Sequence, residues 1–295
     1  MAKECSIIHS DPRAVSSPGT AFGCPRDFLG NRFVYVVISP RAKGLSIGVN
    51  LNPDRYCNFD CAYCEVDRSV PSKEQTLDME VMADELQKTL HIVRSGFIRH
   101  YPPFRRTPDS LLLLKHVTLS GDGEPTFCAN FAATLQTVMH VRARSNSFFK
   151  IVLVTNASGL DLPGVQSGLR SFTRDDEIWA KLDGGTQGYL QTVNGTKISI
   201  EQILSNILLV ARVRPVVIQS LFPSVNGLAP AQEEIQEYAM RLKELKDAGA
   251  KISLVQIYSA TRPTPRSECG HLPLKMLSQI AQTVRVVAGL EAEVF

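Results

Sequence analysis

Short apolar runs alternate with stretches of helical periodicity along most of the chain. From residue 45 onward, six runs are apolar and rich in β-branched residues, and apolar residues three or four positions apart follow each run. Strands that are covered on both faces have this composition, and helices that cover them show this spacing. The six predicted strands lie in LSIGVNL, KHVTLS, KIVLVTN, EIWAKLD, PVVIQSLF and KISLVQIY.

Alternating strands and helices predict parallel βαβ units and therefore an α/β fold. Six units instead of eight indicate a partial (β/α)6 TIM-like barrel that stays open on one side. Before the barrel, RFVYVVIS and RAKG predict a strand and a turn that form a hairpin with LSIGVNL. We expect residues 1–44 to form an N-terminal extension and hairpin strand, and residues 45–295 to form the barrel.

Composition adds few constraints on function. The chain has 295 residues, of which 44% are hydrophobic and 21% charged, as in an ordinary globular protein with a large core. A net charge of +3 does not require a nucleic acid partner. The N-terminus has no apolar signal region and the chain has no run of about 18 apolar residues, so we expect a cytoplasmic protein without a membrane span. Seven cysteines, an odd count, then indicate reduced thiols.

Three of these cysteines lie within CNFDCAYC, as Cys57, Cys61 and Cys64. A structural zinc site usually has two separated pairs of ligands, and this chain has no second pair. Three thiolates in one loop instead favour a four-iron cluster in which one iron is left for another ligand. The alternative is a non-catalytic binding protein that is stabilised by zinc at the same cysteines.

The motif resembles the CxxxCxΦC motif of the radical S-adenosylmethionine superfamily, with Tyr63 as the aromatic residue. The resemblance implies a partial barrel, a [4Fe-4S] cluster on the three cysteines, and S-adenosyl-L-methionine on the fourth iron. LSGDGEPTF, at the end of the second strand, resembles the family's GGE motif. It implies that Gly121, Asp122, Gly123 and Glu124 bind the cofactor, although Asp122 replaces the usual glycine.

The wider pattern, with NLNPDRYCNFDCAYCEVDR, VTNAS and WAKLDGGT, is similar to the group that includes the wyosine-base synthases of tRNA. Those synthases hold a second cluster on three further upstream cysteines, whereas this chain has Cys5 and Cys24 there. We therefore expect one cluster and a small-molecule or natural-product substrate, with a tRNA base as the alternative. The resemblance also implies an electron donor such as a flavodoxin or ferredoxin.

Polar residues gather at the predicted strand ends, where parallel barrels place their chemistry. Alternation along EIWAKLD places Trp179, Lys181 and Asp183 on one face of the strand. A buried Lys and Asp at a strand end are costly unless they pair with each other or act in function. The further residues that we expect to bind the cofactor are Tyr63, Asn156, Lys181, Asp183 and Gln219. The candidate catalytic residues are Cys128, Lys181, Asp183 and Tyr258.

Two further features have an ordinary explanation beside a functional one. Cys128 and Cys269 follow predicted strand ends and could donate a hydrogen atom, but a lone cysteine is more often a small buried apolar residue. The stretch HIVRSGFIRHYPPFRRTP has four arginines and no acid. It could bind the phosphates of RNA or a nucleotide, but a solvated basic loop is favoured over an RNA partner.

Overall fold

Eight strands form one curved sheet in the order β1-β2-β3-β4-β5-β6-β8-β10. The structure is a computed structural model that describes residues 28–295 except 70, 146–147, 263 and 265. The strands of this sheet are β1 (Val34–Ser39), β2 (Gly44–Asn50), β3 (Leu114–Ser120), β4 (Lys150–Thr155), β5 (Glu177–Lys181), β6 (Val216–Leu221), β8 (Ile252–Tyr258) and β10 (Ala292–Val294). A separate two-stranded sheet pairs β7 (Ser224–Val225) with β9 (Cys269–Gly270).

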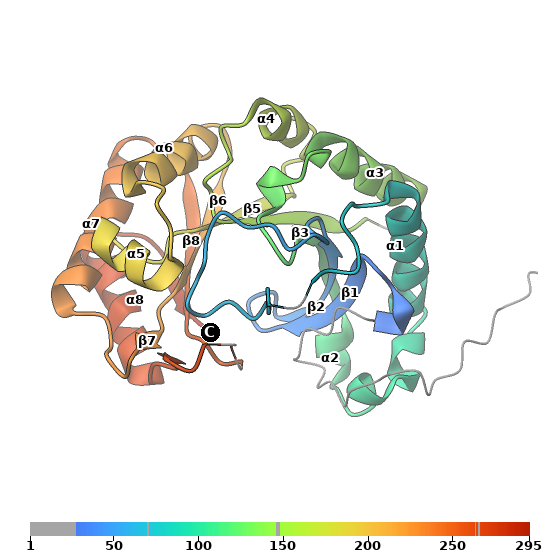
Figure 1. Cartoon of the computed structure of the whole chain (residues 1–295), viewed down its shortest axis with the longest axis horizontal. Helices are drawn as coiled ribbons and strands as arrows, with labels where there is room; N and C mark the ends of the chain where they lie inside the picture. Colours follow the sequence, from blue (N-terminus) through green and yellow to red (C-terminus); the bar gives the residue numbers. More distant parts are fainter. Residues whose placement is uncertain (1–27, 70, 146–147, 263, 265) are drawn as a thin grey trace, which may run out of the picture.

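Helices lie outside the sheet and form an outer crescent around it (Figure 1). They are α1 (Met79–Arg94), α2 (Asp109–Leu112), α3 (Phe131–Arg144), α4 (Pro163–Leu169), α5 (Gln187–Asn194), α6 (Ile200–Ala211), α7 (Gln232–Asp247) and α8 (Leu274–Ala288). None of the helices in the described part of the chain is long and apolar enough to cross a membrane.

The strand order follows the chain order, as in a barrel built from successive βα units. All neighbours in the sheet are parallel except β1, which pairs with β2 as an antiparallel hairpin. The α/β class, the partial barrel and the hairpin are therefore confirmed. Residues 1–27 lie outside the described residues, and so do Cys5 and Cys24, so the predicted extension stays a prediction.

Three elements differ from the sequence prediction. The edge strand β10 was missed, because it is only three residues long at the end of the chain. Two helices, α5 and α6, follow β5 where one was expected. The basic stretch that was predicted as a loop contains 3₁₀ turns at Phe97–His100 and Pro102–Phe104 and is followed by the short helix α2.

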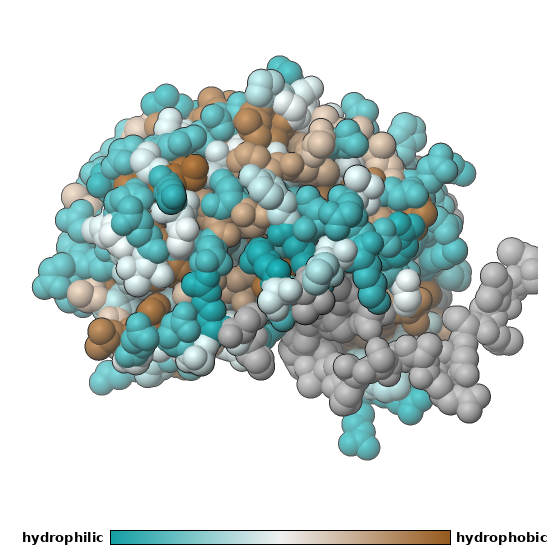
Figure 2. Space-filling view, in the orientation of Figure 1, coloured by the Kyte–Doolittle hydropathy of each residue, from teal (hydrophilic) through white to brown (hydrophobic). Residues whose placement is uncertain are grey.

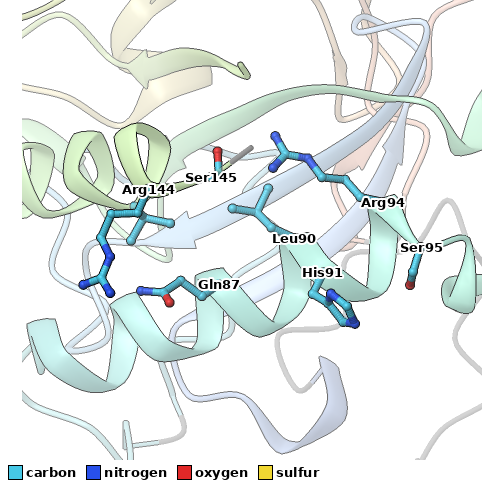
Figure 3. Close-up of a pocket in the computed structure, with 8 residues that line it drawn as sticks. Gln87, Leu90, His91, Arg94, Ser95, Arg144 and Ser145 are labelled. Carbon is cyan, nitrogen blue, oxygen red and sulfur yellow. The ribbon is translucent and has the colours of Figure 1, made fainter. Parts of the chain in front are cut away.

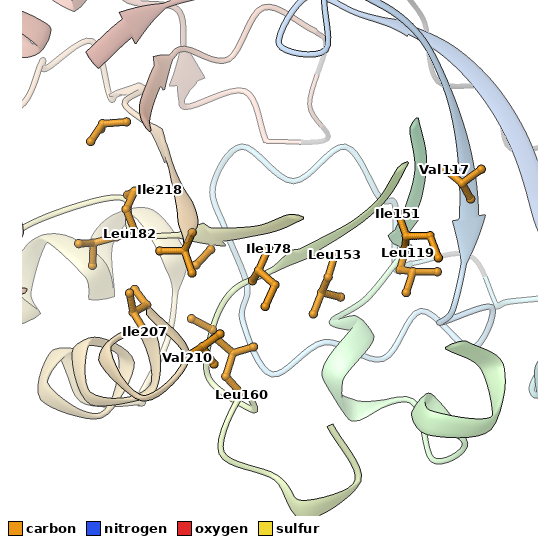
Figure 4. Packing of buried hydrophobic residues seen from close by; sticks show 14 of the residues in the cluster. Val117, Leu119, Ile151, Leu153, Leu160, Ile178, Leu182, Ile207, Val210 and Ile218 are labelled. Atoms are coloured by element: carbon orange, nitrogen blue, oxygen red, sulfur yellow. The ribbon is translucent and has the colours of Figure 1, made fainter. Parts of the chain in front are cut away.

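The main core lies between the outer face of the sheet and the helices. Figure 4 shows Ile178 of β5 and Ile218 of β6 near Ile207 of α6, with side chains of β3 and β4 further along the sheet. Leu153, Ile178 and Ile207 are fully buried. The inner face of the sheet carries a second, smaller cluster of Val152, Trp179 and Val217. The strands are thus covered on both faces, which explains their nearly continuous apolar sequences.

A buried carboxylate joins α1 to the start of the sheet. Glu85, on the inner side of the helix, accepts hydrogen bonds from the backbone N–H groups of Arg32 (2.7 Å), Phe33 (2.9 Å) and Val34 (3.2 Å). These groups precede or open β1, where they would otherwise lack a partner in the β1–β2 ladder. Glu85 therefore fixes the first strand against the helix that follows the cysteine motif.

Replacing Glu85 with Ala should lower the free energy of unfolding by about 3 kcal/mol or more, because several buried donors would lose their acceptor. The control is Glu80→Ala, the same change at an exposed position of α1, which should cost less than about 1 kcal/mol. Urea denaturation of both variants measures the difference. Equal losses in the two variants would contradict this role for Glu85.

Candidate active site

The cysteine loop runs from the end of β2 across the mouth of the barrel and is fixed to α5. The backbone N–H of Asp60 donates to the carbonyl of Asn194 (2.9 Å), and that of Ala62 donates to the carbonyl of Val193 (2.8 Å). Gly195 ends the helix with a φ of +56°, and a Cβ at this position would lie 2.6 Å from the Asp60 carbonyl oxygen. This close backbone approach places the loop beside the end of β5.

Each of the three thiols in this loop accepts an N–H group. The donors are the backbone of Phe59 to Cys57 (3.5 Å), Nδ2 of Asn194 to Cys61 (3.4 Å) and a terminal guanidinium nitrogen of Arg68 to Cys64 (3.1 Å). Hydrogen bonds to sulfur are a means by which proteins tune iron–sulfur clusters, so this donor set fits such a group chemically.

The thiols are not assembled into a metal site. Within the described ranges, no group of three or more His, Cys, Asp or Glu side chains is arranged to hold a metal ion. Burial raises the pKa of Cys57 to about 12 and that of Cys61 to about 11. Both thiols are therefore protonated at neutral pH, and binding a metal centre as thiolates would release protons.

The turn after β3 packs directly on the cysteine loop. A Cβ on Gly123 would lie 1.7 Å from the carbonyl oxygen of Tyr56, which accepts the backbone N–H of Glu124 at 3.1 Å. A Cβ on Gly121 would lie 2.8 Å from Oδ1 of Asn50 and 2.9 Å from Oδ1 of Asn52. Oδ1 of Asn52 is buried and has no partner among the described residues. The turn therefore needs both glycines, and it leaves one buried acceptor open beside them.

Asp122 is held at the same turn by Asn50. Its backbone N–H donates to Oδ1 of Asn50 (3.0 Å), and its carboxylate accepts Nδ2 of the same residue (3.0 Å). The residue that replaces the family's glycine is thus fixed to the end of β2.

Glu124 has both carboxylate oxygens occupied inside the protein. It accepts the backbone N–H (3.1 Å) and the hydroxyl (2.7 Å) of Thr126, the hydroxyl of Thr155, and the backbone N–H of Asn156 (2.7 Å). Burial nevertheless raises the pKa of this carboxyl above its ordinary value. These contacts join the ends of β3 and β4 through the Glu124 side chain, and the expected role of Glu124 in cofactor binding stays a prediction.

Asn156 connects the end of β4 to the cysteine loop. Its Nδ2 donates to Oδ1 of Asn58 (2.9 Å), and its Oδ1 accepts the backbone N–H (3.0 Å) and hydroxyl (2.6 Å) of Ser158. The loop is thus tied to the ends of β3 and β4 as well as to α5.

Four residues predicted separately lie in one network at the end of β5. Asp183, 2% exposed, accepts Lys181 Nζ at 3.2 Å and also the Tyr63 hydroxyl, and Lys181 donates to the Tyr258 hydroxyl at 3.2 Å. Burial acts most strongly on the pKa of Lys181 and would lower it, but Asp183, Tyr258 and Cys61 together raise this pKa above its ordinary value. Burial, together with Asp183, raises the pKa of Tyr63 well above its ordinary value. Lys181 is therefore a cation and Tyr63 a neutral donor.

Two more donors complete the surroundings of Asp183. They are Nδ2 of Asn194 and the backbone N–H of Leu221, each at 2.8 Å. The sequence reasoning did not identify Asn194, because an Asn before Gly is an ordinary helix end and carries no other signal.

The other predicted site residues lie apart from this network. Gln219 donates to Gln256 (2.8 Å), and both are buried within the barrel. Cys128 lies beside Asn130 and Thr134 at the start of α3, and burial raises its pKa. Cys269 follows the sixth barrel strand, β8, as expected, and lies in β9 of the small separate sheet.

A cavity of about 420 Å³ lies outside the barrel, between α1 and α3 (Figure 3). Its lining is basic and polar, with His91, Arg94 and Arg144 over a floor of Leu90 and Val141. It does not adjoin the cysteine loop, and we assign no part of the chemistry to it. Hydrophilic residues also gather near the middle of the face in Figure 2, around the segment that carries the cysteines.

The fold is similar to those of two solved proteins. The chain aligns over 82% of its length with Streptococcus suis SuiB, solved bound to S-adenosylmethionine, with a TM-score of 0.56 and 15% sequence identity. It also aligns over 86% of its length with TYW1, solved with a lysine–pyruvate adduct bound, with a TM-score of 0.51 and 13% identity. The chain spans 49% of the SuiB chain and 84% of the TYW1 chain.

The curated relatives are distant. A UPF0026 protein of Helicobacter pylori (strain ATCC 700392 / 26695) is 22% identical over 239 residues, which are 80% of this chain and 70% of the relative. A UPF0026 protein of Synechocystis is 26% identical over 177 residues, which are 59% of this chain and 57% of the relative. No family model matches the chain.

Replacing Asp183 with Asn should lower the free energy of unfolding by about 3 to 5 kcal/mol, because the ammonium of Lys181 would lose its buried counter-ion. Adding Lys181→Met should restore part of this loss, since the unpaired charge is then removed. Chemical denaturation of the single and double variants measures the coupling. A double variant no more stable than Asp183→Asn would contradict a buried ion pair.

His116 predicts a pH dependence of stability. It lies inside the barrel with its ring 5.2 Å from that of Trp179, and burial, with Lys150 and Arg41 nearby, lowers its pKa to about 3. Below about pH 6.5 the unfolded chain binds a proton that the folded chain does not, so stability should fall as the pH falls from 6.5 toward 3.

The fall due to His116 should reach about 2 kcal/mol between about pH 6.5 and about pH 5, and His116→Asn should remove it. Urea denaturation at the two pH values is the measurement, and His140→Asn, at an exposed position of α3, controls for the loss of a histidine. An unchanged pH dependence in His116→Asn would show that His116 is not buried as a neutral ring.

Proposed function

We propose that this chain is a radical S-adenosylmethionine enzyme with one [4Fe-4S] cluster, held by Cys57, Cys61 and Cys64. The observation that carries the proposal is the position of the cysteine loop. It spans the carboxyl ends of the strands, where its residues contact the turn after β3, the end of β4 and the end of β5. Barrel enzymes place their reacting groups at this end, and SuiB, of similar fold, was solved with S-adenosylmethionine bound.

When bound, the cluster would supply one electron to S-adenosylmethionine, whose cleavage to methionine gives a 5′-deoxyadenosyl radical that abstracts a hydrogen atom from the substrate. An external reductant such as a flavodoxin or ferredoxin would provide the electron. The chain's own residues would bind and orient the reactants.

The glycine turn after β3 is the proposed site of the amino acid part of the cofactor. Gly121 and Gly123 permit close approach to the cysteine loop, and Oδ1 of Asn52 is a buried acceptor that suits an amino group. Glu124 acts as a positioning residue in this proposal, because its carboxylate joins the turn to β4.

Lys181, Asp183 and Tyr258 are the proposed polar wall of the substrate site. Lys181 holds its proton, so it offers a cationic donor and not a base. A small-molecule or natural-product substrate suits a site within the barrel. A tRNA base is the second candidate, and the likeness in fold to TYW1 over most of both chains favours it.

Anaerobic reconstitution should give about four irons and about four sulfides per chain. The reduced protein should then convert S-adenosylmethionine to 5′-deoxyadenosine. Cys61→Ala should lose most of the iron and nearly all of this activity, because one thiolate ligand is gone. Cys269→Ala, in the separate small sheet, controls for the loss of a cysteine. Iron and sulfide assays and chromatography of the nucleoside products provide the measurements.

Zinc in equal amount to the chain, with no sulfide, would instead support the zinc-stabilised binding protein. S-adenosylhomocysteine as the product, without deoxyadenosine, would point to another class of chemistry.

A further inference from the structure

Arg41 carries a guanidinium that forms no ion pair with any other described residue. Arg41 lies in the turn between β1 and β2, and its guanidinium stacks over the ring of Tyr258 at 4.2 Å from the centroid. Its Nε is buried and has no hydrogen-bond partner, and none of the ion pairs of the described residues includes Arg41. A half-buried guanidinium has five N–H donors and is costly to leave unpaired.

Two observations place Arg41 on the inner side of the sheet, namely its stacking on Tyr258 and its effect on the pKa of His116. Tyr258, on the same strand face as Gln256, also accepts the hydrogen bond of Lys181 from β5. Arg41 is close enough to His116 on β3 to lower the pKa of its imidazole, although burial has the larger effect. The guanidinium therefore lies between the lower interior of the barrel and the polar network at its mouth.

The charges that surround Arg41 are otherwise matched. Lys181 pairs with Asp183 at 3.2 Å, and Lys150 pairs with Glu177 at 2.5 Å. The second carboxylate oxygen of Glu177 accepts a hydrogen bond from Nε1 of Trp179 at 2.8 Å. Asp183 and Glu177 thus already have their own donors, and among these described charges Arg41 is the positive charge that lacks a carboxylate.

We propose that Arg41 binds an oxyanion of the substrate, a carboxylate or a phosphate, inside the barrel. Its face is covered by Tyr258 and its Nε is buried, so its two terminal nitrogens are the part left to form a paired contact with two oxygens. The inference rests on the proposed function in taking the barrel interior as the substrate site, and it narrows the substrate to an acidic molecule.

The proposal is tested by calorimetric titration. The oxidised, reconstituted protein is titrated with inorganic phosphate or with succinate, at constant ionic strength in sodium chloride. We expect saturable binding of at least one of the two anions at one site per chain. The anion that binds more tightly indicates whether the substrate carries a phosphate or a carboxylate. Arg41→Gln should weaken that binding at least about tenfold, the effect of losing a charged hydrogen-bond pair. Arg106→Gln, an exposed arginine outside the barrel, changes the net charge equally and should leave binding unchanged.

Absence of saturable binding by both anions would overturn the proposal, and so would equal binding by the wild type and Arg41→Gln or an equal loss in Arg106→Gln. A second measurement uses only the wild type, so its result does not depend on how a variant folds. Phenylglyoxal should modify Arg41 more slowly in the presence of the bound anion, as followed by mass spectrometry, and an unchanged rate would also overturn the proposal.

The same wild-type preparation is assayed for 5′-deoxyadenosine, which separates the two claims. Deoxyadenosine formation without anion binding would refute the role of Arg41 and leave the proposed function standing. Anion binding without deoxyadenosine would keep the anion site and refute the proposed function.

Discussion

The carboxylate of Asp183 organises the mouth of the barrel. It accepts donors from β5, from the residue that ends β6, from the end of α5 and from the cysteine loop. A buried carboxylate is tolerated only when such donors surround it. Because these donors come from positions as far apart as Tyr63 and Leu221, the position of the cysteine loop depends on contacts that only the folded chain provides.

Buried carboxylates also join other pairs of elements in this fold. Glu85 joins α1 to β1, Glu124 joins β3 to β4, and Glu234 of α7 accepts the backbone N–H of Gly185 (2.5 Å) in the turn after β5. In each case a buried carboxylate accepts a backbone N–H group that has no partner in its own strand or helix. These contacts hold the strand ends in register, so that a loop with three cysteines can cross them at a fixed place.

Local pattern was sufficient to predict the six barrel strands, the hairpin and most helices. Local pattern does not predict which residues distant in the sequence contact each other in the fold. Nothing in the sequence around Arg41 or Asn194 indicates that Tyr258 or Asp183 would be the neighbour. The motif at Glu124 also gave no sign that two threonine hydroxyls and two backbone N–H groups would surround that carboxylate.

The most direct test of the account is electron paramagnetic resonance of the anaerobically reduced protein, before and after S-adenosylmethionine is added. The account predicts the signal of one reduced [4Fe-4S] cluster per chain, and a shift of its g values when the cofactor binds the open iron. A signal that S-adenosylmethionine leaves unchanged, or no cluster signal from a folded chain, would contradict it.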